Sequence, residues 1–513
     1  MKHIKKLASL LLALVMALSL AVTAFADEST TYSITINNST AGHTYEAYQI
    51  FTGDLHEGVL SNIKWGSSVS NAASLSDAAA VAEKLDTNYT DTDKMTVADL
   101  LEMITLGNPA ADSGKTSNPY VISGLAAGYY LVKDKDGSLT DKGDAYTEYI
   151  VKVVGNVTAD PKSDVPTVVK KVKDTNDSTG VTSGWQDSAD YDIGDSVPFQ
   201  LKATLADNVS SYTTYKVVFH DTLSKGLTYN KDAKVYIDGT ETNGFTVTAT
   251  VNADGTTTLT VSCDDVKALG AGNSSVITVE YTAKLNENAV LGSAGNPNKV
   301  YLEYSNNPNK SESGENHETG KTPEDTVIVF TYQTIINKVD SENKPLTGAA
   351  FKLEKLIKGK DGAADTWTTV KKFTVDETTT SFTFSGLDDG QYKLTETKTP
   401  AGYNTIDPIY FVIEATHDAT ADTPALTVLK AYLTDENGNK KTEVKDGGTV
   451  NIDLGTVDLT AGSITTTVVN KSGSELPSTG GIGTTIFYVL GGVLVLAAVV
   501  LLVTKKRMSG AEK

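Results

Sequence analysis

Along most of its length the chain repeats one pattern. Val, Thr and Tyr alternate with polar residues, and Gly, Asn and Asp interrupt the alternation at short intervals. Alternation with a period of two places one side of a β-strand in a core, and frequent turn residues join such strands into sandwiches. Two stretches, Ser76 to Leu85 and Val97 to Leu106, instead favour short helices. Because 513 residues exceed one hydrophobic core, the pattern predicts a mainly β chain of tandem β-sandwich modules.

Two breaks divide this β-rich body. Pro161 and Pro166 flank the first break, and a stretch rich in Ser, Asn, Glu and Gly from Ser305 to Pro323 marks the approach to the second. We expect an N-terminal module at residues 27–164, which contains both helices, a middle module at 165–324 and a C-terminal module at 325–472.

The N-terminal end predicts a secretory signal peptide at residues 1–26. Three lysines (Lys2, Lys5 and Lys6) precede an apolar run from Leu7 to Val22, and Ala24-Phe25-Ala26 fits a cleavage site. The alternative is a first membrane helix, but the apolar run is short and the cleavage site is well formed. We therefore expect the mature chain to be secreted and to begin at Asp27.

The other end combines a short motif with an apolar stretch and a basic tail. The motif Leu476-Pro477-Ser478-Thr479-Gly480 lies in a spacer at 473–484. The next 20 residues, 485–504, carry no charge and would span about 30 Å as a helix, one bilayer core. The basic tail at 505–513 would then stay on the cytoplasmic side. The alternative is an ordinary single-span anchor.

The motif is similar to the LPxTG sorting signal of Gram-positive surface proteins. This resemblance implies that a sortase cuts between Thr479 and Gly480 and passes the Thr479 carbonyl to an amine. The protein would be tethered to the membrane before sorting and anchored to the cell wall afterwards.

Composition excludes several other classes of function. A net charge of -20 argues against a nucleic-acid binder. Cys263 is the only cysteine, which rules out an intramolecular disulfide scaffold and a cysteine-rich zinc site. We find no Ser-His-Asp arrangement, metal-ligand cluster or glycine-rich phosphate loop, so we predict no enzyme activity, no cofactor and no metal. The acidic loops lack an Asp-x-Asp-x-Asp-Gly pattern and are expected to be solvated.

Three polar residues of the C-terminal module lie on partly apolar strand faces. Lys338 shares its face with Ile336, Glu396 shares its face with Leu394, and Asn470 follows the same parity as Val468. An unpaired charge on such a face is costly, so the three residues need one another as partners. The alternative is a buried ion pair with a nearby amide.

Sequence segments around this trio in the C-terminal module strengthen this interpretation. They include Pro345-Leu346-Thr347-Gly348, Tyr392 to Thr397 and Val468-Val469-Asn470-Lys471. The module resembles the CnaB-type immunoglobulin-like domain of Gram-positive adhesins and pilins. That resemblance implies an isopeptide bond between Lys338 and Asn470, assisted by Glu396.

The middle module shows the same order of lysine, acid and asparagine. Lys170 shares its strand face with Val168 and Val172, Asp221 with Phe219, and Asn298 with Val300. The module resembles the middle isopeptide domain of backbone pilins, which implies a Lys170–Asn298 bond assisted by Asp221. The alternative is that these are unrelated polar residues at strand ends.

The two trios supply the residue types that such a bond requires. An apolar core lowers the pKa of the lysine, so that the neutral amine can attack, and raises the pKa of the acid, so that it stays protonated. The protonated acid can polarise the asparagine carbonyl and pass a proton to the leaving ammonia. Folding supplies the proximity.

The junction of the first two modules contains a candidate acceptor. The N-terminal module is similar to that of class C sortase-polymerised pilins, and it shows no lysine–acid–asparagine trio. Pro161-Lys162 resembles the pilin motif of backbone pilins, whose lysine attacks the sortase–pilin thioester, although Asp160 and Ser163 depart from the usual pattern. The alternative is that Lys162 is a solvated linker lysine.

Together these resemblances indicate a major pilin of a Gram-positive fimbria, in which Thr479 of one subunit joins Lys162 of the next. The implied partners are a class C pilus sortase, other copies of the chain, minor pilins, and a housekeeping sortase with peptidoglycan. This hypothesis allows a ligand on a host surface, whereas it predicts no binding to nucleic acid. The alternative is a single-copy adhesin or minor pilin that is anchored to the wall without polymerisation.

Overall fold

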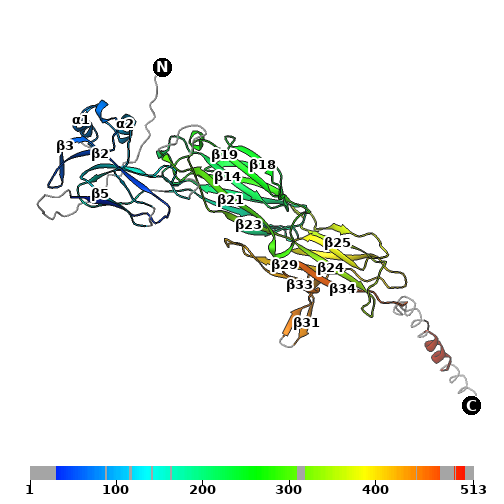
Figure 1. Cartoon of the computed structure of the whole chain (residues 1–513). Helices are drawn as coiled ribbons and strands as arrows, with labels where there is room; N and C mark the ends of the chain where they lie inside the picture. The colour runs from blue at the N-terminus through cyan, green and yellow to red at the C-terminus, as the bar shows by residue number, and fades with distance from the viewer. Residues whose placement is uncertain are drawn as a thin grey trace, which may run out of the picture.

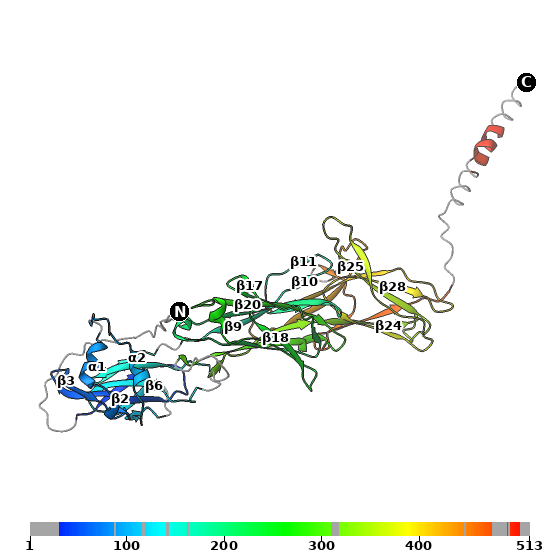
Figure 2. The ribbon, with the colours of Figure 1, turned by 90° about the horizontal axis from the view of Figure 1, so that it is seen from above.

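The computed structural model describes residues 30–86, 89–114, 118–139, 143–161, 164–308, 318–445, 448–473, 490 and 493–502. The predicted signal peptide, Lys162 and the motif at 476–480 lie outside these residues. The β-sheets form an elongated row that runs from β2 and β5 at one end, through β14 and β21, to β24 and β34 at the other (Figure 1 and Figure 2). This mainly β architecture confirms the predicted fold class.

The N-terminal part holds two small sheets, in the orders β5-β1-β8 and β3-β2-β6-β7, with β4 paired to β2. Its two α-helices fall within the two predicted stretches and pack Val81 and Leu100 into a core with Ile50 and Phe51. The elements are β1 (Tyr32–Ile36), β2 (Tyr45–His56), β3 (Val59–Trp65), α1 (Ala78–Lys84), α2 (Val97–Met103), β4 (Ala111–Asp112), β5 (Tyr120–Leu125), β6 (Gly128–Asp134), β7 (Glu148–Val153) and β8 (Val157–Ala159).

The middle part packs two larger sheets around one core. One sheet has the order β12-β23-β21-β14-β19-β18, with β22 on β21, and the other has the order β17-β16-β20-β13-β9, with β15 on β20. The strands are β9 (Thr167–Val172), β10 (Thr175–Asn176), β11 (Val181–Thr182), β12 (Ser188–Asp190), β13 (Ser196–Thr204), β14 (Val217–Leu223), β15 (Leu227–Tyr229), β16 (Lys234–Ile237), β17 (Thr240–Thr242), β18 (Thr246–Val251), β19 (Thr257–Cys263), β20 (Val276–Leu285), β21 (Asn296–Ser305), β22 (Thr319–Lys321) and β23 (Asp325–Phe330).

The C-terminal part also packs two sheets, in the orders β27-β24-β34-β33 and β26-β25-β28-β29-β30. Its first strand β24 and its last strand β34 are parallel neighbours, with Lys338 opposite Val468. The strands are β24 (Tyr332–Val339), β25 (Ala350–Ile357), β26 (Thr366–Lys372), β27 (Ser381–Leu387), β28 (Gly390–Lys398), β29 (Ile409–His417), β30 (Leu426–Thr434), β31 (Thr442–Lys445), β32 (Gly448–Asn451), β33 (Thr456–Asp458) and β34 (Ser463–Val469).

The boundary between the middle and C-terminal parts differs from the prediction. We placed the boundary before residue 325, but β23 (Asp325–Phe330) pairs with β21 and β12 of the middle sheet. Only Thr331 separates β23 from β24. The strand β22 lies within the Ser- and Gly-rich stretch and pairs with β21 of the middle sheet, so this stretch does not mark the boundary between the modules.

The predicted membrane helix at 485–504 is described only in part. Residue 490 and residues 493–502 are helical. Within the residues that the structure describes, no helix has both the length and the hydropathy needed to cross a membrane.

Candidate crosslinking sites

All six residues of the two predicted trios point into the cores. Lys170, Asp221 and Asn298 in the middle part, and Lys338 and Asn470 in the C-terminal part, have no exposed surface, and Glu396 is 6% exposed. Their strands alternate buried and less buried residues with the expected parity. The inward orientation that the sequence predicted is therefore confirmed, whereas the covalent bonds remain a prediction.

In the middle part three strands bring the trio to one place. Lys170 lies on β9, Asp221 on β14 and Asn298 on β21. The Lys170 Nζ donates to Asp221 Oδ1 at 2.5 Å. The amide oxygen of Asn298 is buried and has no hydrogen-bond partner among the described residues, so it is free to accept a proton from an acid.

A fourth residue, Tyr281 on β20, joins the trio, and the sequence analysis missed it. Its hydroxyl oxygen accepts from Lys170 Nζ at 3.1 Å and from Asn298 Nδ2 at 2.8 Å. The same hydroxyl donates to Asp221 Oδ2. Amine and amide thus meet at one hydroxyl group. An inward tyrosine in an alternating strand looks like an ordinary core residue, and only its need for a polar partner could have suggested a role.

Burial shifts both ionisable members of this trio toward their neutral forms. Desolvation lowers the pKa of Lys170, although the negative charge of Asp221 opposes the shift. Desolvation also raises the pKa of Asp221, against the positive charge of Lys170. A proton moved from the ammonium to the carboxylate therefore leaves a neutral amine beside a neutral acid, which is the pair that attack on an amide requires.

Tyr281→Phe is expected to slow formation of the middle crosslink by about 10- to 100-fold. The substitution keeps the ring but removes one buried hydrogen-bonding group, and each 1.4 kcal/mol of lost stabilisation is about tenfold in rate. The measurement is a time course of intact mass after refolding. Tyr229→Phe is a matched control, because its ring packs against that of Tyr281 whereas its hydroxyl accepts from the backbone N–H of Ala233. Equal rates in all three proteins would contradict a role for Tyr281.

In the C-terminal part Lys338 lies on the first strand β24, Asn470 lies at the end of its neighbour β34, and Glu396 lies on β28 of the other sheet. Asn470 directly follows β34, and its Nδ2 donates to Glu396 Oε2 at 3.0 Å. The Lys338 Nζ donates to the carbonyl oxygens of Val339 and Val468, each at 3.0 Å. The second oxygen of Glu396 and the amide oxygen of Asn470 are buried without partners among the described residues.

Burial prepares Lys338 as a nucleophile in the same way. Desolvation lowers its pKa to about 8, with the negative charge of Glu396 opposing the shift. Because an ordinary lysine has a pKa near 10.5, a much larger fraction of the Lys338 amine is neutral near pH 7.

The N-terminal part contains a different buried cluster that the sequence analysis did not identify. His43 has no exposed surface and contacts two carboxylates, Asp134 at 2.7 Å through Nδ1 and Asp144 at 2.8 Å through Nε2. Asn38 and Tyr45 surround the ring. The residues come from separate loops and strands, so no local motif signals them.

This histidine predicts a stability change with pH. Burial alone would lower the pKa of His43, but its hydrogen bonds and charges from Asp134 and Asp144 raise it to about 9. The protonated His43 therefore stabilises the folded N-terminal module by about 3 kcal/mol. This contribution to the free energy of unfolding is fully present below pH 6.5, near the unfolded pKa, and is lost as the pH rises through about 9. Amide hydrogen exchange of β2 and β6 between pH 6 and 10 measures it. His43→Gln should flatten this dependence, and an unchanged profile would contradict the assignment.

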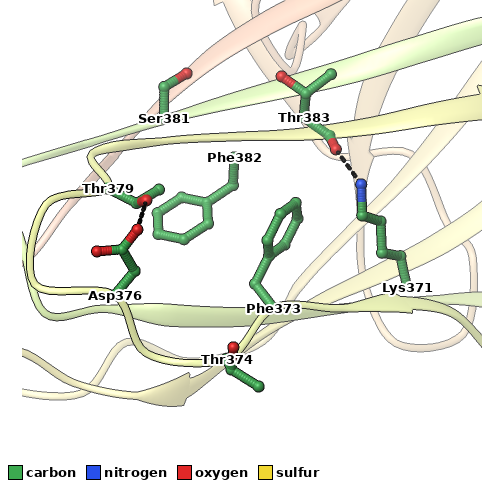
Figure 3. A pocket seen from close by; sticks show the side chains of 8 residues that line it. All are labelled: Lys371, Phe373, Thr374, Asp376, Thr379, Ser381, Phe382 and Thr383. Carbon is green, nitrogen blue, oxygen red and sulfur yellow. Dashed lines mark hydrogen bonds between the residues drawn. The ribbon is translucent and has the colours of Figure 1, made fainter.

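The C-terminal part also has an open pocket of about 480 Å³, shown in Figure 3. Phe373 and Phe382 form its apolar floor. The polar groups at its rim bond within the chain, since Lys371 donates to the Thr383 carbonyl and Asp376 accepts from Thr379. None of the lining residues belongs to either trio.

Three families match separate parts of the chain. Residues 193–308 match the family described as Gram-positive pilin backbone subunit 2, Cna-B-like domain. Residues 333–425 match a prealbumin-like fold domain of the SpaA type, and residues 468–509 match the LPXTG cell wall anchor motif.

Known proteins are similar to the chain over most of its length. The chain is 27% identical over 452 residues to the trypsin-resistant surface T6 protein of Streptococcus pyogenes serotype M6, covering 77% of each chain. The solved structure of the T6 backbone pilin is 20% identical, with a TM-score of 0.53, and the match covers 87% of this chain and 100% of that one. The full-length major pilin SpaD of Corynebacterium diphtheriae matches at 17% identity with a TM-score of 0.48, covering 88% of this chain and 100% of that one. The likeness to the T6 structure concerns the fold.

Proposed function

We propose that this chain, which combines backbone-pilin domains with an LPXTG cell wall anchor motif, is the major structural subunit of a sortase-assembled Gram-positive pilus. The anchor motif makes it a cell-wall-anchored surface protein. The observation that supports a load-bearing role is the presence of two buried trios of lysine, acid and asparagine in tandem modules. Its matching domains are structural pilin domains rather than those of an enzyme family.

Each trio would form one amide bond without an external reagent. The neutral lysine amine attacks the asparagine side-chain carbonyl carbon, and a C–N bond forms while the acid donates a proton to the carbonyl oxygen. When the tetrahedral intermediate collapses, its hydroxyl returns the proton to the carboxylate, the original C–N bond breaks, and ammonia leaves with the proton that the amine gave up. In the middle module the Tyr281 hydroxyl, which contacts the leaving nitrogen and Asp221, is placed to relay that proton.

The positions of the two bonds define a path for mechanical load. Tension that enters at Lys170 would cross to Asn298, and tension that enters at Lys338 would cross to Asn470, so residues 171–297 and 339–469 would carry none of it. Asn298 lies on β21, and β22 and β23 follow it, so the middle bond does not reach the last strand of the middle sheet. The segment between Asn298 and Lys338 would lie outside both bonds, and its strands β22 and β23 are held by sheet hydrogen bonds.

Polymerisation would place the N-terminal module outside this path. If Thr479 of one subunit joins Lys162 of the next, tension enters after residue 161 and bypasses β1 to β8. This head-to-tail contact does not close on itself and therefore propagates as a fibre. The partners proposed are a class C pilus sortase, further copies of the chain, minor pilins, and a housekeeping sortase that transfers the finished fibre to peptidoglycan.

Cell-wall extracts boiled in detergent separate this proposal from a single-copy adhesin. A covalent pilus gives a ladder of high-mass species that an antibody raised against this protein detects. A single wall-anchored adhesin gives one band at the mass of the monomer, and that result would overturn the proposal.

A further inference from the structure

The joint between the middle and C-terminal parts holds a cluster that the proposed function does not use. Main-chain hydrogen bonds cross this joint, for example from Asp187 to Ala419 and from Ile193 to Gly386. Figure 2 shows the β10 and β11 hairpin beside β25 at this place. Asp174, just before β10, and Asp190, at the end of β12, face His417, at the end of β29.

The three side chains converge on one small volume, and all are largely buried. The exposed fraction is 9% for His417, 22% for Asp174 and 3% for Asp190. The His417 Nε2 lies 3.4 Å from Asp174 Oδ2 and 3.6 Å from Asp190 Oδ1. A charge-assisted hydrogen bond would be about 2.7–2.9 Å, so both of these ion pairs are longer than a direct contact with an imidazolium normally is.

These separations match those between ligands of a tetrahedral metal ion. With metal–ligand bonds of about 2.0–2.2 Å, two ligand atoms at tetrahedral angles lie about 3.3–3.6 Å apart. One imidazole with two carboxylates suits a first-row divalent ion such as Zn²⁺, whereas Ca²⁺ and Mg²⁺ prefer oxygen ligands alone. Three protein ligands would leave the fourth position for solvent.

The other ring nitrogen of His417, Nδ1, forms a hydrogen bond with Ser188, as the second nitrogen of a metal-binding histidine commonly does with an outer partner. Ser188 donates its hydroxyl proton to the Asp418 carbonyl at 2.5 Å, so its oxygen accepts from His417 Nδ1 at 2.7 Å. That hydrogen bond places the Nε2 lone pair toward Asp174 and Asp190. Metal-binding histidines commonly use such an outer partner to fix the ring and its tautomer.

An unpartnered polar group provides independent support. Tyr332 has no exposed surface, and its hydroxyl interacts with the neighbouring carboxylate of Asp190 but forms no well-aligned hydrogen bond among the described residues. A buried hydroxyl normally has a partner. A water molecule or a bound ion at the cluster would supply the missing one.

A neighbouring acidic cluster at the same joint serves as a contrast. Asp177, Asp192, Asp195 and Asp388 also converge, but the ammonium of Lys355 contacts three of them, Asp177, Asp192 and Asp388. The position for a cation is therefore already occupied by a side chain. Within the part of the chain that the structure describes, Asp174 and Asp190 form ion pairs with His417 and with no lysine.

We propose that Asp174, Asp190 and His417 bind one divalent ion of the Zn²⁺ type and thereby clamp the middle and C-terminal modules together. The two aspartates come from one module and the histidine from the other, so the ion would stiffen the joint without any covalent bond. Only the neutral ring can act as a ligand, and in the tautomer that donates from Nδ1 to Ser188 the Nε2 lone pair is available to the ion. The site is independent of the crosslinks and of polymerisation.

The test uses the full chain, purified in mild detergent and stripped of metal with a chelator. Titration with Zn²⁺ in a calorimeter is expected to show one ion bound per chain, with a rise of several degrees in the unfolding midpoint. Co²⁺ is expected to give the intense visible absorption of a tetrahedral site, which aqueous octahedral Co²⁺ lacks. These measurements on the unaltered protein need no variant to fold.

Matched variants locate the ion. Asp174→Asn and His417→Gln are each expected to abolish stoichiometric binding and the Co²⁺ absorption, and Ser188→Ala is expected to weaken binding about 10- to 100-fold. Asp177→Asn, which alters the lysine cluster of the same joint, is expected to bind as the unaltered chain does. Absence of stoichiometric binding, or binding that survives both ligand substitutions, would overturn the proposal and leave His417 as an imidazolium between two carboxylates.

Discussion

Residues 27–475, expressed alone, are expected to weigh about 34 Da less than their plain sequence, since each Lys–Asn bond expels one ammonia of about 17 Da. Asp221→Ala should restore the mass of one ammonia by blocking the Lys170–Asn298 bond, and Glu396→Ala should restore the other by blocking Lys338–Asn470. The double variant should match its own sequence. Intact mass spectrometry measures all four proteins.

The same variants are expected to lose much of their stability. Each bond would close a loop of more than 120 residues, and by analogy with a disulfide such a closure contributes about 5 kcal/mol. That corresponds to a fall of roughly 10–20 °C in the unfolding midpoint of a module of this size. Calorimetry should show that only the transition belonging to the altered module moves.

Controls separate the missing bond from a missing acid. Lys170→Arg and Lys338→Arg each keep a positive charge but cannot form the amide of their own module, so each should weigh only one ammonia, about 17 Da, less than its plain sequence. Glu354→Ala removes another buried acid of the C-terminal module, one that pairs with Lys352 and Lys393, and should keep both bonds. If the unaltered protein has the mass of its plain sequence, the crosslink mechanism is wrong, although the anchor motif would still stand.

Strand parity explains why the inward-facing residues could be predicted from the sequence. A period of two decides which residues face the core, so the inward orientation of Lys170 and Lys338 followed from their immediate neighbours. The helices at Ala78–Lys84 and Val97–Met103 followed from local apolar spacing. Strand parity could not assign β23 to a module, because its pairing with β21 depends on the whole sheet and not on its own residues.

Contacts between distant segments escaped the sequence analysis for the same reason. Tyr281 joins its trio through a hydroxyl whose partners lie on three other strands. The His417 cluster combines residues more than 200 positions apart, so no spacing rule could reveal it. Sequence pattern determines which face a side chain occupies, whereas only the packing of sheets and modules decides which side chains meet there.

Lys162→Ala is expected to abolish the ladder of covalent multimers on cells that carry the pilus sortase, while monomer still reaches the cell wall. In the proposed assembly the sortase would hold the Thr479 carbonyl as a thioester, and only a neutral, accessible amine could release it into a subunit–subunit amide. Without that amine, water or the wall precursor would take the acyl group instead. Immunoblots of wall extracts measure the loss, which should be complete.

The matched control decides whether Lys162 is the acceptor or one of several. Lys152 is an exposed lysine on β7 of the same module, so Lys152→Ala should leave the ladder intact. Lys162→Arg should fail like Lys162→Ala, because a guanidinium stays protonated and is a poor nucleophile. A ladder that persists in Lys162→Ala would place the acceptor elsewhere. Loss of the ladder in Lys152→Ala as well would point to a disturbed module, and then tryptic peptides of the multimers, which retain the Thr479–lysine junction, would identify the acceptor directly.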